Sequence, residues 1–416
     1  MTKRKWLALV ALFGALTLVT AACANDEEGG GGETGPTGTE PTGPTAADRI
    51  EVTVHFQGAL TGDYNYLVIP AFQGAQLRAN EFNAEAGFPA TITMVQGDTQ
   101  GDPANAPPVV DAVVSDANAV AVIGPAFSGE SEASGDTYNE AGIPFVTPSA
   151  TNPGLADKGW DYWYRGVAND AGQGALAGRY LDEVLGVANV FVSHDKGTYG
   201  QGLAEVVRTT LDGAGVDVAG FEGIQSGSSD FSAFISTVEA SGADALFFGG
   251  YDADFGKIVK QARDAGLDIP LMSADGSTSS TFLSLAGDAA EGVHLVCPCN
   301  LAGDFTAKYQ GEYGGDASAV PIYAAEGYDA LSVVGEGIRY AISEKGAASA
   351  EEIRAGIKEY LDSLTVDAPY QGVAKQIAFD PGTHELASAD PDALYYFYSV
   401  QGGVITPLGS APEVLG

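Results

Sequence analysis

Six short segments of this chain gather the side chains that could do chemistry. They place hydroxyl, carboxylate and phenol groups among glycines, and they span residues 58–64, 123–130, 147–151, 195–200, 249–252 and 273–276. Hydroxyls and backbone N–H groups can bind an anionic group, whereas a carboxylate can receive a cation. The segments therefore predict a site for a small polar molecule.

The spacings that catalytic and metal sites need are missing from the sequence. A serine hydrolase needs Gly-x-Ser-x-Gly, but Ser128 stands in Ala-Phe-Ser-Gly. The four histidines show no metal-binding spacing, and Gly-Gln-Gly at 172–174 is only part of a dinucleotide-binding turn. An exported α/β enzyme is therefore the least favoured function, and we expect neither a cofactor nor a metal site.

The charge balance excludes a further class of partner. The 55 acidic residues outnumber the 19 lysines and arginines, which gives a formal net charge of −36. Such a chain repels DNA and RNA. Its composition, 45% hydrophobic and 18% charged, is that of a globular protein.

From residue 49 onward, strand-like runs alternate with amphipathic stretches. We expect strands at 50–56, 91–95, 119–123, 144–147, 189–193, 216–221, 245–248, 270–273, 376–379 and 394–400. We expect helices at 66–86, 104–116, 130–141, 173–185, 199–214, 231–240, 255–265, 303–345 and 350–363. The alternation predicts two doubly wound parallel sheets in series. Ligands of such sheets bind beyond the carboxyl ends of the strands, where the six segments lie.

Taken together, these segments resemble a known family. They occur in the order and at the spacing of the Leu/Ile/Val-binding solute-binding proteins of ABC transporters, as do Gln-Ala-Arg-Asp-Ala-Gly at 261–266 and Tyr-Ala-Ala-Glu-Gly-Tyr-Asp-Ala at 323–330. The resemblance covers nearly all of residues 49–410. It implies the type I periplasmic binding fold, an α/β protein of two doubly wound parallel-sheet lobes joined by three crossovers. The implied lobes are 49–168 with 297–373, and 169–296 with 374–416.

The resemblance also implies a role for particular residues. It assigns the ligand carboxylate to the hydroxyls of Ser128 and Thr151 and to backbone N–H groups of the loop that holds Ser149 and Ala150. It assigns the α-ammonium to Asp275. Two residues of the second lobe, Tyr199 and Tyr251, would close over the amino acid. The candidate pocket walls are Tyr64, Leu67, Phe127 and Tyr323.

Each of these residues also has an ordinary structural interpretation. Ser128 could cap the helix expected to begin near residue 130, and Thr151 could hold a turn. The tyrosines at 199 and 251 could lie on amphipathic surfaces, and Asp275 before a glycine is common in turns.

The N-terminus predicts export. Three basic residues, an apolar run and small residues lead to Cys23, as in a bacterial lipoprotein signal at 1–22 whose cysteine is lipidated. An uncleaved anchor is the alternative. Residues 23–48 lack core-forming side chains and predict a flexible tether. We therefore expect an extracytoplasmic protein that is anchored to the cell membrane by lipid alone.

The other two cysteines, Cys297 and Cys299, stand close together near an expected crossover. A disulfide between them would stiffen a hinge strand, and two free thiols are the alternative. A metal site is disfavoured because His294 is the only other ligand nearby.

The function we expect is capture of an amino acid, with an aliphatic or branched side chain, for delivery to an ABC permease. The same fold could instead bind a short amide, a urea-like compound or a carboxylate. It could also present its ligand to a membrane receptor as a sensor.

Overall fold

The computed structural model describes residues 49–299, 303–314 and 322–416. The predicted signal peptide at 1–22, the lipidated Cys23 and the tether at 23–48 lie outside the described residues. No helix of the described ranges is long and apolar enough to cross a membrane.

The first lobe is built on a sheet of five parallel strands in the order β2-β1-β3-β4-β5. These strands are β1 Ile50–Gly58, β2 Ala90–Asp98, β3 Ala119–Ile123, β4 Phe145–Thr147 and β5 Trp163–Arg165. Every residue of β3 is buried, because successive side chains point to opposite, helix-covered faces. Val122 packs in one hydrophobic cluster, and its neighbours Ala121 and Ile123 pack in another.

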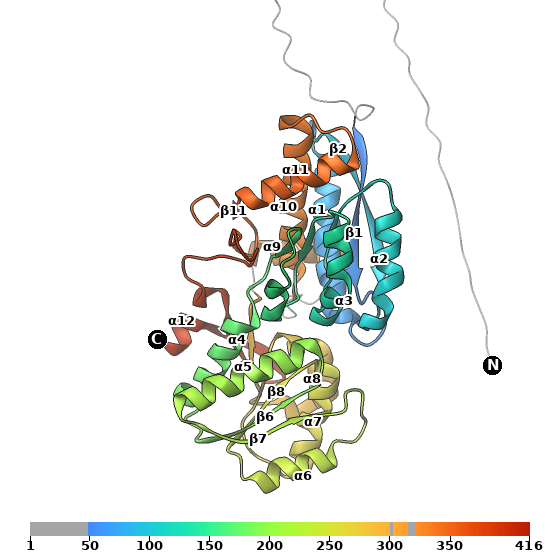
Figure 1. Cartoon of the computed structure of the whole chain (residues 1–416). Coiled ribbons are helices and arrows are strands. Elements are labelled where there is room, and N and C mark those ends of the chain that lie inside the picture. The colour runs from blue at the N-terminus through green and yellow to red at the C-terminus, as the bar shows by residue number, and fades with distance from the viewer. Residues whose placement is uncertain (1–48, 300–302, 315–321) are drawn as a thin grey trace, which may run out of the picture. The chain divides into compact units, whose positions relative to one another are not determined.

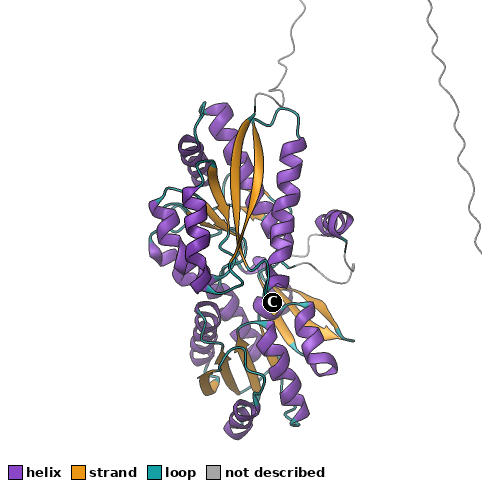
Figure 2. Cartoon of the chain, turned by 90° about the vertical axis from the view of Figure 1, so that its right-hand side faces the viewer, coloured by secondary structure: helices purple, strands orange, loops and turns teal. Residues whose placement is uncertain are grey.

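Helices cover both faces of this sheet (Figures 1 and 2). The first-lobe helices are α1 Asn65–Ala84, α2 Ala106–Ser115, α3 Ser128–Glu140, α9 Gly303–Tyr313, α10 Ala324–Arg339 and α11 Ala350–Ser363. Two glycines let α1 and α10 pack closely. A Cβ atom on Gly74 would lie 1.9 Å from the carbonyl oxygen of Ala324, and one on Gly327 would lie 2.0 Å from that of Ala71. Larger residues at these two positions would force the helices apart.

The second lobe is built on a seven-stranded sheet in the order β14-β13-β10-β9-β8-β6-β7. Its strands are β6 Asn189–His194, β7 Asp217–Gly223, β8 Ala245–Gly249, β9 Leu271–Ser273, β10 His294–Cys297, β13 Tyr396–Gln401 and β14 Val404–Ser410. All pairs are parallel except β10–β13 and β13–β14. The helices are α4 Asp170–Arg179, α5 Thr198–Ala214, α6 Ser232–Ser241, α7 Asp252–Asp264, α8 Ser280–Ala286 and α12 Ala411–Leu415. Phe247 packs in the cluster of α4 and α5, whereas Phe248 packs in the cluster of α6, α7 and α8.

The chain passes between the two sheets three times. It leaves the first sheet after β5, returns from β10 to α10, and crosses again between α11 and β13. The predicted α/β fold of two parallel-sheet lobes with three crossovers is therefore confirmed. The exact lobe boundaries, at 168/169, 296/297 and 373/374, stay predictions.

Some elements differ from those expected. Strands β5 and β10 were not predicted, because Trp-Tyr-Arg of β5 ends on a charged residue and His-Leu-Val-Cys of β10 begins with a polar one. The predicted strand at 376–379 is confirmed in part: Gln376–Ile377 (β12) forms a strand, and it pairs with Tyr370–Gln371 (β11) in a separate two-stranded sheet. Cys297, the last residue of β10, forms a disulfide with Cys299.

Candidate ligand-binding site

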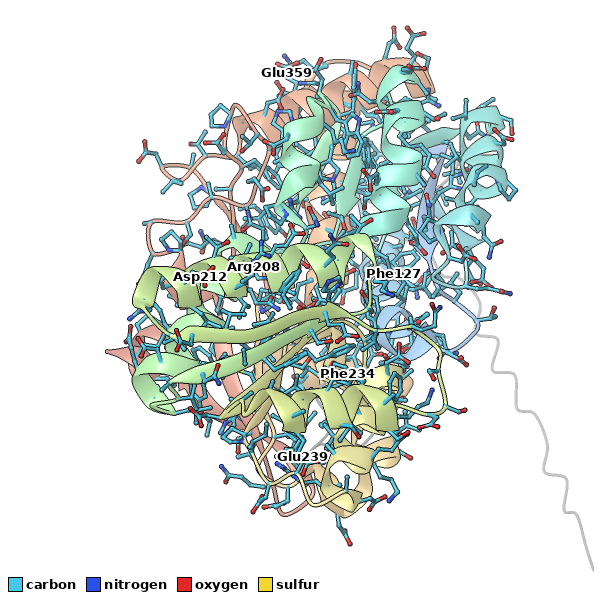
Figure 3. The ribbon with its side chains drawn as sticks, turned by 60° about the horizontal axis from the view of Figure 1, so that its bottom comes forward. Phe127, Arg208, Asp212, Phe234, Glu239 and Glu359 are labelled. Carbon is cyan, nitrogen blue, oxygen red and sulfur yellow. A yellow bond between two sulfur atoms is a disulfide. The ribbon has the colours of Figure 1, made fainter. Side chains whose placement is uncertain are left out.

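A cavity opens where strands of both sheets end. The empty space between its lining residues, open solvent at the mouth included, is about 300 Å³. Phe127, one of its walls, lies beside the N-terminal end of α5 (Figure 3). Both lobes contribute lining residues, which are Leu67, Val68, Ala126, Phe127, Ser128, Ser149, Tyr199, Tyr251, Asp275, Gly276 and Tyr323.

Ser128 lies at the polar end of the first-lobe wall. It is the first residue of α3, and the helix has no side-chain cap, so the capping role is not the one it plays. Its Oγ accepts the backbone N–H of Asn152 at 3.2 Å, which leaves the Ser128 hydroxyl proton able to donate elsewhere. The unpaired N–H groups and the dipole of the α3 N-terminus favour an anion at this end of the cavity.

The loop after β4 supports this end of the cavity. The Ser149 hydroxyl lines the cavity and donates to the carbonyl oxygen of Ala126 at 2.8 Å. Thr151 lies behind it, fully buried, and its hydroxyl donates to Oδ2 of Asp170 at 3.0 Å. Ala150 donates its backbone N–H to Thr147. The structure thus brings Ser149 to the cavity and turns the Thr151 hydroxyl toward a second carboxyl group.

A buried arginine fixes the same loop. Nη1 of Arg165, on β5, donates to the carbonyl oxygen of Ala150 at 2.6 Å, and Nη2 donates to that of Asn152 at 2.9 Å. The guanidinium also makes two bonds to the Glu385 carboxylate, at 2.8 and 2.7 Å. This bidentate pair is the strong form of a charge-assisted hydrogen bond. Arg165 therefore holds the loop in place from behind the cavity.

Asp275 forms the acidic end of the cavity, just beyond β9. Gln173 and Tyr199 both donate to its Oδ1, the tyrosine at 2.7 Å, and Tyr323 donates to its Oδ2. All three donors are neutral. Burial raises the pKa of the Asp275 carboxyl above its usual range, and these hydrogen bonds offset only part of that rise because they stabilise the charged form. Both oxygens of the Asp275 carboxyl group therefore have hydrogen-bond donors, and none of these donors carries a positive charge.

A second buried carboxyl group, Asp170, stands behind the first. It is the first residue of α4, and its Oδ1 has no hydrogen-bond partner among the described residues. Burial, and then the charge of Asp275, raise the pKa of Asp170 well above its usual range, and the charge of Arg165 partly opposes them. Because each of these two carboxyl groups disfavours ionisation of the other, a cation placed beside Asp275 would favour its charged form.

Aromatic rings close the remaining side. Tyr251 packs against Tyr64, Phe127 and Tyr199, with ring centroids 5.1, 5.5 and 5.2 Å apart. Tyr64 and Phe127 come from the first lobe and the other two from the second. Tyr64 is outside the cavity lining and supports the rings that form it. With Leu67, these rings give the cavity one apolar wall.

The described residues hold no cluster of His, Cys, Asp and Glu arranged for a metal ion. The site instead combines an anion-binding helix N-terminus, a buried carboxylate and an apolar wall. This combination suits a small molecule that carries opposite charges and an apolar substituent.

Sequence comparison identifies the family. A model of the periplasmic binding protein family matches residues 51–403. The chain belongs to this family. A curated relative, the leucine-, isoleucine-, valine-, threonine- and alanine-binding protein of Pseudomonas aeruginosa, is 32% identical over 324 residues, which cover 76% of this chain and 84% of the relative. The Leu/Ile/Val-binding protein of Escherichia coli is 32% identical over 255 residues, 61% of this chain and 69% of that protein.

Solved structures of periplasmic binding proteins have the same fold as this chain. The branched-chain amino acid transporter substrate binding protein LivJ of Streptococcus pneumoniae, in complex with isoleucine, has a TM-score of 0.74 and 27% identity, and the match covers 85% of this chain and 97% of LivJ. The leucine binding protein LivK of Thermotoga maritima shows the same fold, with a TM-score of 0.75 and 23% identity over 86% of this chain and 97% of LivK. The relatives are solute-binding proteins, which confirms that this periplasmic binding protein is not an enzyme.

Sequence reasoning missed several residues of the site, among them Gln173, Asp170 and Arg165. Gln173, within the Gly-Gln-Gly that suggested a partial dinucleotide turn, lies in α4 and donates to Asp275. Arg165 is the last residue of β5, a strand that was not predicted, and Asp170 lies shortly after it at the start of α4. Recognising that strand would have placed both at a carboxyl end, where the other site residues were sought.

Proposed function

We propose that this periplasmic binding protein captures an α-amino acid with an aliphatic side chain between its two lobes and hands it to an ABC permease. Asp275 carries the proposal. The Asp275 carboxyl group is 3% exposed and has only neutral hydrogen-bond donors. Its charged form is stabilised when a cation binds beside it. The α-ammonium of an amino acid would supply that cation.

The opposite end of the cavity supports the same ligand. The ligand carboxylate would lie at the N-terminus of α3 and accept from the Ser128 hydroxyl and from backbone N–H groups of the loop around Ser149. Tyr199 and Tyr251 would cover the backbone of the amino acid from the second lobe. Leu67 and Phe127 would face the side chain, and their apolar surface favours an aliphatic group over a charged one.

The test is a binding panel on protein freed of bound ligand. Leucine, isoleucine, valine, alanine and glutamate are compared with 4-methyl-2-oxopentanoate, which lacks the amine of leucine. Thermal shift screens the panel and calorimetry gives each Kd. A ligand at a hundredfold its Kd should add roughly 2.7 kcal/mol of stability. We expect shifts with the aliphatic amino acids and none with the keto acid.

Asp275→Asn sharpens the test because it removes the charge with little change of shape. Leaving one partner of a buried charge pair alone costs about 3–5 kcal/mol, so leucine affinity should fall roughly a hundredfold or more. Asp252→Asn is the matched control, since Asp252 is also a buried second-lobe carboxyl but is outside the cavity lining. Equal leucine affinity of wild type and Asp275→Asn would refute the role of Asp275. A panel in which only amides, urea or organic acids bind would refute the amino-acid proposal.

Family membership places the protein outside the cytoplasm, and we propose that a lipid on Cys23 holds it at the membrane. The lipoprotein-like signal at 1–22 and the polar stretch 23–48 support this anchor. Radiolabelled palmitate should enter the wild type and not Cys23→Ala, which should be released into the medium. Labelling of both variants alike would contradict the proposal.

A further inference from the structure

A hydrogen bond between two residues outside the cavity lining joins the two lobes. Nδ2 of Asn152, in the first-lobe loop after β4, donates at 2.6 Å to the carbonyl oxygen of Thr198, the first residue of α5 in the second lobe. Neither residue lines the cavity. We call this pair the interlobe clasp.

The first-lobe side of the interlobe clasp is held rigidly. Oδ1 of Asn152 accepts the N–H of Gly154 at 2.8 Å, its own N–H donates to Oγ of Ser128 at 3.2 Å, and its carbonyl oxygen accepts from Arg165 at 2.9 Å. Every polar group of Asn152 is therefore engaged. The same residue positions the Ser128 hydroxyl and reaches the opposite lobe.

The second-lobe side is shaped to admit the amide. A Cβ atom on Gly202, one turn along α5 from Thr198, would lie 2.4 Å from Nδ2 of Asn152. No side chain larger than hydrogen fits there while the amide keeps its bond. At the exposed edge, the Thr198 hydroxyl also donates to Glu132 at 3.3 Å, and Glu132 pairs with Lys158 at 2.6 Å.

We propose that Asn152 is a positioning residue that couples ligand binding to lobe closure through the interlobe clasp. The bond to Thr198 exists only when the α5 N-terminus lies against the loop, so it stabilises the closed arrangement alone. A ligand that draws Ser128 into place also orders Asn152 for this bond. Because the interlobe clasp does not contact the ligand, it should increase the affinity for every ligand by the same factor. The proposal rests on the proposed function for the ligand, and on the contacts above for the mechanism.

Two variants break the interlobe clasp from opposite lobes. Asn152→Asp keeps the acceptor for Gly154 but loses the N–H₂ donor to Thr198. Gly202→Ala leaves the loop untouched, places a methyl group against the amide, and suits a helix interior better than glycine does. For both, we expect the Kd of every bound amino acid to rise about tenfold, through faster dissociation, with the order of preference unchanged. Glu132→Gln, which keeps an acceptor at the exposed edge, is the control and should change Kd less than twofold.

Closure is measured separately from affinity. Fluorophores at Asp111→Cys on α2 and Asp212→Cys on α5, both exposed positions, report the distance between the lobes. Both interlobe clasp variants should shift this distance toward longer values at a fixed ligand concentration and also without added ligand. If both keep the wild-type distances and dissociation rates, the proposal is overturned. If the wild type binds no amino acid, the proposed function falls, and the distance comparison still decides whether the interlobe clasp holds the lobes together.

Discussion

The hydroxyl of Tyr323 donates to Oδ2 of Asp275 across the two lobes. Tyr323 precedes α10 of the first lobe, whereas Asp275 follows β9 of the second. The tyrosine adopts a left-handed backbone conformation, with φ of 63°, that is unfavourable for a bulky residue. This conformation directs a first-lobe hydroxyl at the carboxyl group that we expect to bind the ligand ammonium. Asp275 would therefore contact both the ligand and the opposite lobe.

Removing that hydroxyl tests the relationship. Tyr323→Phe keeps the ring and deletes one donor to a buried carboxylate. A hydrogen bond to a charged group contributes about 1.5–3 kcal/mol, so we expect the Kd for leucine to rise roughly tenfold or more in calorimetry. Tyr180→Phe is the control, because Tyr180 also bonds through its hydroxyl, to His294, but away from the cavity. Unchanged affinity of Tyr323→Phe would show that the cross-lobe bond adds nothing to closure.

How far the site was predictable depends on how clearly the sequence marks the strands that carry it. Asp275 and Ser128 were found because they follow strands whose buried runs are recognisable, and a parallel sheet gathers such ends at one edge. Asp170 was not found because β5, with the sequence Trp-Tyr-Arg, ends on a charged residue and was not recognised as a strand. The sequence also carries no signal for the direction of the Thr151 hydroxyl, since the side chain that accepts from it lies 19 residues away in another element. The fold was predictable from local periodicity, whereas hydrogen-bond partners depend on tertiary packing.

The Arg165–Glu385 pair should be essential for stability. Arg165 is fully buried, and Glu385→Gln would leave its guanidinium without a countercharge. We expect a loss of about 3 kcal/mol in the free energy of unfolding from urea titration. Glu359, an exposed residue of α11 (Figure 3), pairs with Lys345. Glu359→Gln breaks this exposed pair and should leave the free energy of unfolding nearly unchanged. Equal effects of the two variants would mean that burial does not decide the contribution of these pairs.

Glu130 should make the stability of the first lobe depend on pH. Burial raises the pKa of its carboxyl from 4.5 to about 7. Between these values the folded state holds a proton that the unfolded state has released, so stability falls as pH rises from 4.5 to 7 and is level above. The shift corresponds to on the order of 3 kcal/mol.

Glu130→Gln should therefore flatten the pH profile of the free energy of unfolding by about that amount between pH 4.5 and pH 8. The glutamine can still accept from Thr99, which donates to Glu130 in the wild type. Glu239→Gln, at an exposed position of α6 (Figure 3), should leave the wild-type profile unchanged. Parallel profiles for Glu130→Gln and wild type would contradict the prediction.

Asp170→Asn should separate stability from function. The buried Asp170 carboxyl group lies close enough to Asp275 for each charge to disfavour the other, and the guanidinium of Arg165 is already bonded to Glu385. Because its pKa is raised, ionising Asp170 costs folding free energy above the unfolded pKa near 4, and asparagine removes this cost. We therefore expect the Tm at pH 7.5 to rise.

The same change should weaken binding. Asparagine keeps an acceptor for Thr151 but cannot ionise, so it removes the attraction for the ligand ammonium that Asp170 provides when it loses its proton. We expect the Kd for leucine to rise relative to the wild type, by an amount that grows with increasing pH as Asp170 of the wild type loses its proton. A higher Tm with unchanged leucine affinity would show that Asp170 acts on Thr151 alone. A lower Tm would show that the charged form of Asp170 is stabilised by its surroundings in the folded protein.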